Sequence, residues 1–212
     1  MEIIVDPGEK KLSEVLKRPV QKLGAIKKIV KPILKKVRQQ GDKALFKYCL
    51  EYDHVQLESL LVTRNEIVRA HDAVSDALKA AIQTARENIE RFHRAQIDRP
   101  IEIQTMPGVV CKRKSKPIEK VGLYVPGGTA PLFSTVLMLG IPAKLAGCRQ
   151  ILLCTPPGKR GRIHPAILYT ADLIGIDRII KTGGAQAIAA MAFGTESVPK
   201  VDKIFGPGNQ YV

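Results

Sequence analysis

The 212-residue sequence has no tryptophan, and its aromatic residues amount to only 5%. It also lacks any apolar run close to the roughly 18–20 residues that span a bilayer, so it predicts no transmembrane helix and no membrane partner. The first residues, Met1–Asp6, place no basic segment before an apolar stretch. We therefore expect no secretory signal and a cytoplasmic location.

Cysteine is scarce as well. The four cysteines form no C-x-x-C pair, and no histidine lies at a zinc-finger spacing from any of them. Isolated thiols in a cytosolic protein are typically reduced and buried. We expect this of Cys49, Cys111, Cys148 and Cys154, and the apolar surroundings of Cys148 and Cys154 predict that both belong to the core.

Acidic residues are in deficit, with 20 Asp and Glu against 34 Lys and Arg, for a net charge of +14. This surplus raises the alternative of a basic nucleic-acid-binding module. Much of it lies in Lys22–Arg38, where basic residues alternate with an apolar face at helical spacing. No aromatic residue is interleaved there to stack on bases. The pattern favours a solvated helix face, and we predict no nucleic-acid partner.

The first of two predicted domains, residues 1–117, is mostly helical. Thr63–Glu66 has the sequence of a capping box, and Asp42 is placed to cap the helix that follows Gly41. Two short strand-like runs, Ile101–Thr105 and Val109–Arg113, flank Pro107 and Gly108 and predict a β-hairpin.

The second predicted domain, residues 118–212, alternates strands with helices. The apolar runs are Val121–Val125, Ile151–Cys154, Ile179–Ile180 and Val201–Phe205. The helical stretches between them are Leu132–Ala146, His164–Ile174 and Ala185–Phe193. This order predicts an α/β fold: a Rossmann-like domain with a mainly parallel sheet, incomplete at its C-terminal end.

Three glycine-rich turns follow strands of this predicted sheet: Tyr124–Pro131, Gly183–Gln186 and Gly206–Asn209. Ligands bind at the carboxyl ends of parallel strands, and glycine lets the backbone approach them closely. None of the turns is a G-x-G-x-x-G or a Walker A sequence, and strand–helix turns also use glycine for purely structural reasons. The coincidence of three turns on one edge, with polar Gln186 and Asn209 among them, favours a shared site.

Several long segments of the chain, in the correct order, resemble the amino-terminal half of the histidinol dehydrogenase family. They are Val37–Leu45, Asn88–His93, Val121–Gly128, Ala130–Met138, Gly183–Ala190, Gly194–Val198 and Val201–Asn209. The resemblance covers nearly the whole chain. It is far more specific than any single glycine motif.

The resemblance implies an NAD- and zinc-dependent oxidoreductase that works as a homodimer. The family oxidises L-histidinol to L-histidine through histidinal with two NAD in succession, the last step of histidine biosynthesis. The NAD-contacting positions of the family fall on Tyr124, Gln186 and Asn209.

The family's zinc ligands, its glutamate–histidine acid–base pair and its substrate-binding residues fall beyond Val212. We therefore assign no catalytic or metal-ligating residue to this chain, and interpret His93 as a surface or packing residue. We expect a truncated or split NAD-side half that is inactive alone. The alternative is a catalytically silent structural or dimerisation fragment.

Overall fold

The computed structural model describes residues 3–6, 8–17, 23–128 and 130–212. The helices in these ranges are α1 (Glu9–Val15), α2 (Leu23–Gln40), α3 (Asp42–Tyr52), α4 (Arg64–Ala73), α5 (Asp76–Arg94), α6 (Phe133–Leu145), α7 (Pro165–Leu173) and α8 (Gly184–Phe193). The strands are β1 (Ile101–Met106), β2 (Val109–Arg113), β3 (Lys120–Tyr124), β4 (Gln150–Thr155), β5 (Arg178–Lys181) and β6 (Lys203–Phe205). None of these helices combines the length and apolarity that a membrane span needs.

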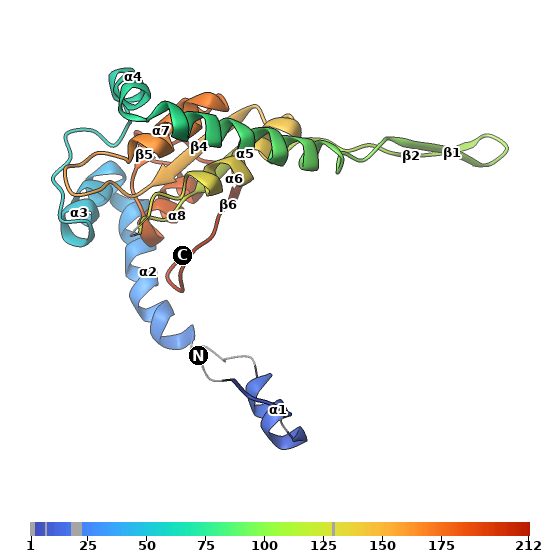
Figure 1. Ribbon diagram of the computed structural model, residues 1–212, viewed down its shortest axis with the longest axis horizontal. Coiled ribbons are helices and arrows are strands. Elements are labelled where there is room, and N and C mark those ends of the chain that lie inside the picture. Colours follow the sequence, from blue (N-terminus) through green and yellow to red (C-terminus); the bar gives the residue numbers. More distant parts are fainter. Residues whose placement is uncertain (1–2, 7, 18–22, 129) are drawn as a thin grey trace.

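A parallel four-stranded sheet with the order β5-β4-β3-β6 forms the centre of the protein (Figure 1). The chain first adds β4 and β5 on one side of β3, and then returns to add β6 on the other side. The predicted α/β class and the Rossmann-like, mainly parallel sheet are thereby confirmed.

Helices cover both faces of this sheet because successive side chains of a strand point to opposite faces. In β4, Ile151 and Leu153 pack into a core with α5, α6 and α7. Leu152 and Cys154 pack into a second core with α2, α3 and α8. Helices α2 to α5 therefore complete the sandwich, and the proposed division at residue 117 stays a prediction.

The start of α4 confirms the predicted capping box. The backbone N–H of Glu66 donates to the Thr63 hydroxyl, and the Glu66 carboxylate accepts from the backbone N–H of Thr63. The predicted cap of α3 is wrong, because Gly41 is its N-cap and Asp42 its first residue. The Asp42 carboxylate instead accepts hydrogen bonds from the loop after α8, at Thr195 and Ser197.

The predicted hairpin is confirmed as an antiparallel pair, β1 and β2, which projects from the body of the protein as a long arm (Figure 1). All of its residues are exposed. Cys111 lies on this arm, so the expectation that it is buried is wrong. Cys49 and Cys154 are buried, and Cys148 is half-buried against the core that contains α6.

Candidate functional site

A pocket of about 590 Å³ opens at the carboxyl edge of the parallel sheet. This volume falls within the roughly 300–1,000 Å³ that small-molecule and cofactor sites occupy. Its lining comes from the ends of all four strands and from α2 and the end of α3: Ile29, Ile33, Tyr52, Asp53, Tyr124, Pro126, Gly127, Gly128, Pro156, Pro157, Gly183, Gly184, Ala185, Gln186, Asn209 and Tyr211.

The topology explains why a pocket forms at this position. The chain runs from β3 to β4 and β5 on one side of β3 and then crosses to β6 on its other side, so the strand order reverses direction beside β3. Such a switch point opens a crevice at the carboxyl ends of the two strands. Tyr124 ends β3 and Asn209 follows β6, so both residues lie at this crevice.

Tyr124 is the most firmly placed of the predicted site residues. Its side chain is 4% exposed, and the backbone N–H of Gly184 donates a 3.0 Å hydrogen bond to its hydroxyl oxygen. Burial raises the pKa of Tyr124, although that hydrogen bond lowers it in part. The phenol is therefore protonated at neutral pH. Its own hydrogen is bonded to no acceptor in the described part of the chain and is free for a ligand.

Gln186 and Asn209 bring amide groups to the same pocket. Gln186 lies in the first turn of α8 and is only 3% exposed, yet its side-chain amide bonds to no other described residue. The Asn209 side-chain oxygen accepts from the backbone N–H of Tyr211, so its NH₂ group remains available as a donor. The structure thus brings all three sequence-predicted site residues into one pocket.

Two glycines let the strand ends approach one another. A Cβ at Gly127 or at Gly183 would lie 2.6 Å from a ring carbon of Pro156, in the turn after β4. Any larger residue at either position would push the turns apart. The glycines of these turns therefore shape the pocket, as well as exposing backbone to it.

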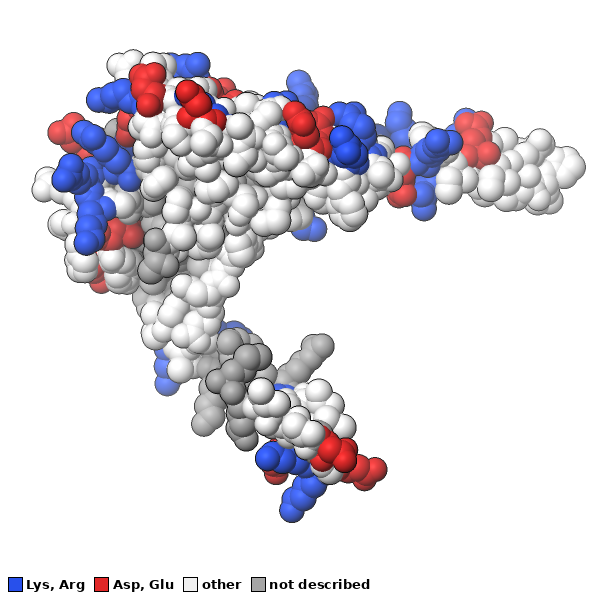
Figure 2. Space-filling view, in the orientation of Figure 1, with Lys and Arg blue, Asp and Glu red and all other residues white. Residues whose placement is uncertain are grey.

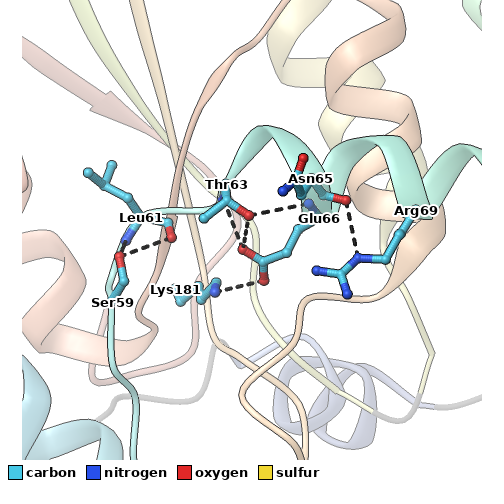
Figure 3. A network of polar contacts seen from close by, with 7 residues as sticks. All are labelled: Ser59, Leu61, Thr63, Asn65, Glu66, Arg69 and Lys181. Carbon is cyan, nitrogen blue, oxygen red and sulfur yellow. Dashed lines mark hydrogen bonds and ion pairs between the residues drawn. The ribbon is translucent and has the colours of Figure 1, made fainter.

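A buried ion pair fixes the strand that leads into the Gly183 turn (Figure 3). Lys181 ends β5, and its ammonium group lies 2.7 Å from the carboxylate of Glu66 in α4, with the two side chains 9% and 16% exposed. Burial alone would raise the pKa of Glu66, but hydrogen bonds from Lys181 and Thr63 outweigh it and lower that pKa. The pair holds the capped start of α4 against the end of β5.

The sequence patterns missed the contribution of the helical region. Tyr52 ends α3 and Asp53 follows it, and both line the pocket together with Ile29 and Ile33 of α2. No local motif marks these positions. Only the packing of α2 and α3 against α8 brings them to the strand ends.

No three histidine, cysteine, aspartate or glutamate side chains lie close enough to hold a metal ion within the described ranges. His93 is half-buried near the end of α5 and bonds to Gln96, which agrees with its predicted surface or packing role. His164 caps α7, where it accepts from the backbone of Ala166. His71 pairs with Asp172 outside the pocket.

The sheet order and the pocket at its switch point define a Rossmann-like α/β protein with a large pocket at the carboxyl edge of its sheet. Comparison with known proteins narrows this class. The chain matches the family profile described as histidinol dehydrogenase over residues 16–212. It belongs to the histidinol dehydrogenase family, a family of oxidoreductases.

Individual relatives agree with this assignment. A histidinol dehydrogenase of Bacteroides thetaiotaomicron is 57% identical over the whole chain, and one of Vibrio cholerae is 52% identical over 97% of it. The crystal structure of histidinol dehydrogenase from Elizabethkingia anophelis has a TM-score of 0.92 and 53% identity over 97% of the chain. The chain spans 47–50% of these three proteins, so it corresponds to about half of each.

Proposed function

We propose that this chain is the NAD-binding half of a histidinol dehydrogenase, in which the complete protein oxidises L-histidinol to L-histidine through histidinal with two NAD. One observation carries the proposal. Tyr124 ends β3, Gln186 follows β5 and Asn209 follows β6, and yet all three line one pocket. Membership of the family supports the reaction, and the sequence resemblance supports the three residues.

The pocket residues fit a nucleotide chemically. Glycine turns and the first turn of α8 present backbone N–H groups, which suit a pyrophosphate. Tyr52 and Tyr211 add aromatic rings, and Ile29 and Ile33 add apolar surface for a base. When bound, NAD⁺ supplies the hydride acceptor.

The side chains of this half hold and orient the cofactor in the proposal. The Tyr124 hydroxyl and the amides of Gln186 and Asn209 donate hydrogen bonds from three sides. Gln186 is only 3% exposed, so the surrounding residues limit the directions in which its side chain can point. These groups are polar and uncharged, so they recognise the shape and the hydrogen-bonding groups of the cofactor more than its net charge.

Zinc and the acid–base pair have no place among the described residues of this half. The described ranges offer no cluster of metal ligands. Substrate binding, zinc and proton transfer therefore fall to the other half of the complete protein.

NAD⁺ should bind this chain weakly, with a Kd of about 1 mM, and Gln186→Ala or Asn209→Ala should weaken binding further. The turns lack the third glycine of the usual fingerprint, so backbone contacts are fewer and the amides contribute more. Loss of one such hydrogen bond costs about 0.5–1.5 kcal/mol. An NMR titration that follows backbone amide shifts measures affinities in this range.

Gln150→Ala is the matched control, because Gln150 starts β4 at the opposite edge of the same sheet. It should leave NAD⁺ binding unchanged. Shift changes confined to residues far from Tyr124, Gln186 and Asn209 would show that the cofactor site is assigned wrongly.

Homodimer formation is the second part of the proposal, and the hairpin arm supports it. Ile101, Ile103, Met106, Val109 and Val110 are large apolar side chains that are all at least 41% exposed on this arm. A projecting pair of strands with exposed apolar side chains is a typical surface for association with another chain.

Sedimentation equilibrium should therefore give twice the monomer mass of 23.3 kDa. A double substitution, Ile101→Lys and Ile103→Lys, should shift the chain toward the monomer, because two charges on one face of β1 oppose burial. The control, Gln104→Lys, adds its charge on the other face of the same strand. A wild-type chain that stays monomeric at all concentrations would argue against the dimer.

The positive charge does not favour a nucleic-acid-binding module. On α2, the basic residues Lys27, Lys28 and Lys31 are exposed while Ile33 and Val37 are buried, which is the predicted solvated face. On the face shown in Figure 2, acidic side chains lie among the basic ones along the upper edge, and a group of basic side chains gathers at the left end.

A further inference from the structure

Asp53 presents an unused hydrogen-bond acceptor at the candidate site. It follows the last residue of α3 and lines the pocket beside the strand ends. Its Oδ2 atom is buried and has no hydrogen-bond partner in the described part of the chain. Buried polar atoms are nearly always bonded, so an unbonded carboxylate oxygen at a pocket wall indicates a partner supplied by a ligand.

Apart from Asp53 itself, the side chains that line the pocket are uncharged or apolar. No lysine or arginine lines the pocket. Burial raises the pKa of Asp53, while the nearby Cys49 thiol and His54 oppose that change. Asp53 also contributes to the raised pKa of Tyr124, which places the carboxylate and the phenol in the same electrostatic environment.

The sheet has no acidic residue at the position where nucleotide-binding sheets usually carry one. In such folds an acidic residue about 20 positions after the first glycine turn, at the end of the second strand, accepts from a ribose hydroxyl. Here β4 ends at Thr155, and Pro156 and Pro157 follow, so this edge carries no carboxylate. Asp53 reaches the same pocket from α3.

We propose that Asp53 accepts a hydrogen bond from a ribose hydroxyl of the bound dinucleotide and thereby selects NAD⁺ over NADP⁺. The inference rests on the proposed function of the pocket. A free hydroxyl can donate to the Asp53 carboxylate, whereas a phosphate on that hydroxyl would bring a second negative charge to a pocket that no lysine or arginine lines. Asp53 thus accounts both for the recognition of NAD⁺ and for the exclusion of NADP⁺.

Titration of the chain with NAD⁺ and with NADP⁺ tests this inference. The wild-type chain should bind NAD⁺ at least about tenfold more tightly than NADP⁺. Asp53→Asn keeps the shape of the side chain and removes its charge. It should weaken NAD⁺ binding by about threefold to tenfold and reduce the preference over NADP⁺. Asp72→Asn, at an exposed position of α4, removes the same charge and should change neither value.

The outcomes separate the inference from the proposed function. If NAD⁺ shifts the amides of Tyr124, Gln186 and Asn209, and Asp53→Asn changes neither affinity nor preference, the role of Asp53 is wrong and the proposed function stands. Equal binding of NAD⁺ and NADP⁺ by the wild-type chain overturns the role of Asp53 without any variant. No NAD⁺ response at these three residues at millimolar concentration overturns both.

Discussion

The 212-residue chain alone should oxidise L-histidinol at less than about one hundredth of the rate of a full-length relative, even with added zinc and NAD⁺. The described residues provide no cluster of metal ligands, and the titratable side chains that line the pocket are three tyrosines and Asp53. Burial raises the pKa of Tyr52 and of Tyr124, so neither phenol can act as a base near neutral pH.

NADH formation measured by absorbance provides the test, with the Bacteroides thetaiotaomicron relative assayed under the same conditions. Loss of positioned acid–base groups alone typically costs about 10²–10⁴-fold in rate. A rate within about tenfold of that relative would mean that this half contains a complete catalytic site, contrary to the proposal.

The largest effect on stability should come from Lys181→Met, which we expect to lower the free energy of unfolding by about 3 kcal/mol. The substitution keeps the length of the side chain and leaves the buried Glu66 carboxylate without its cation. The penalty arises from an uncompensated buried charge. A double variant with Glu66→Gln should therefore be less destabilised than the sum of the two single variants.

Urea unfolding measured at two pH values provides a second test of the Lys181–Glu66 ion pair. The pKa of Glu66 is lowered in the folded protein, so the stability that it contributes is present above its ordinary pKa of about 4.3 and is lost as the pH falls through the folded value. The penalty of Lys181→Met should accordingly shrink in acid. Lys112→Met, which breaks a surface pair with Glu102, serves as the control. An equal effect of the two substitutions would contradict the account.

Local chemistry was sufficient to predict much of the fold. Strand alternation, the hairpin and the Thr63 capping box depend on neighbouring residues, and all three are confirmed. The cap at Asp42 was predicted wrongly because its partners, Thr195 and Ser197, lie more than 150 positions away. A local preference fails when a distant segment offers stronger hydrogen bonds.

The residues of the candidate site also include some that the sequence predicted and one that it did not. Gln186 and Asn209 could be expected at one site because they lie in glycine turns after strands, whose carboxyl ends share one edge of a parallel sheet, and the family resemblance added Tyr124. Asp53 could not be identified from the sequence, because nothing in its own segment indicates that the end of α3 packs beside those turns. Its unpaired oxygen is visible only in three dimensions.

A crystal structure of this chain grown with NAD⁺ tests the central claim most directly. The account predicts a dinucleotide in the pocket at the carboxyl edge of the sheet, within hydrogen-bond distance of Tyr124, Gln186 and Asn209. A dinucleotide bound elsewhere on the chain, with these three side chains out of contact, would contradict it.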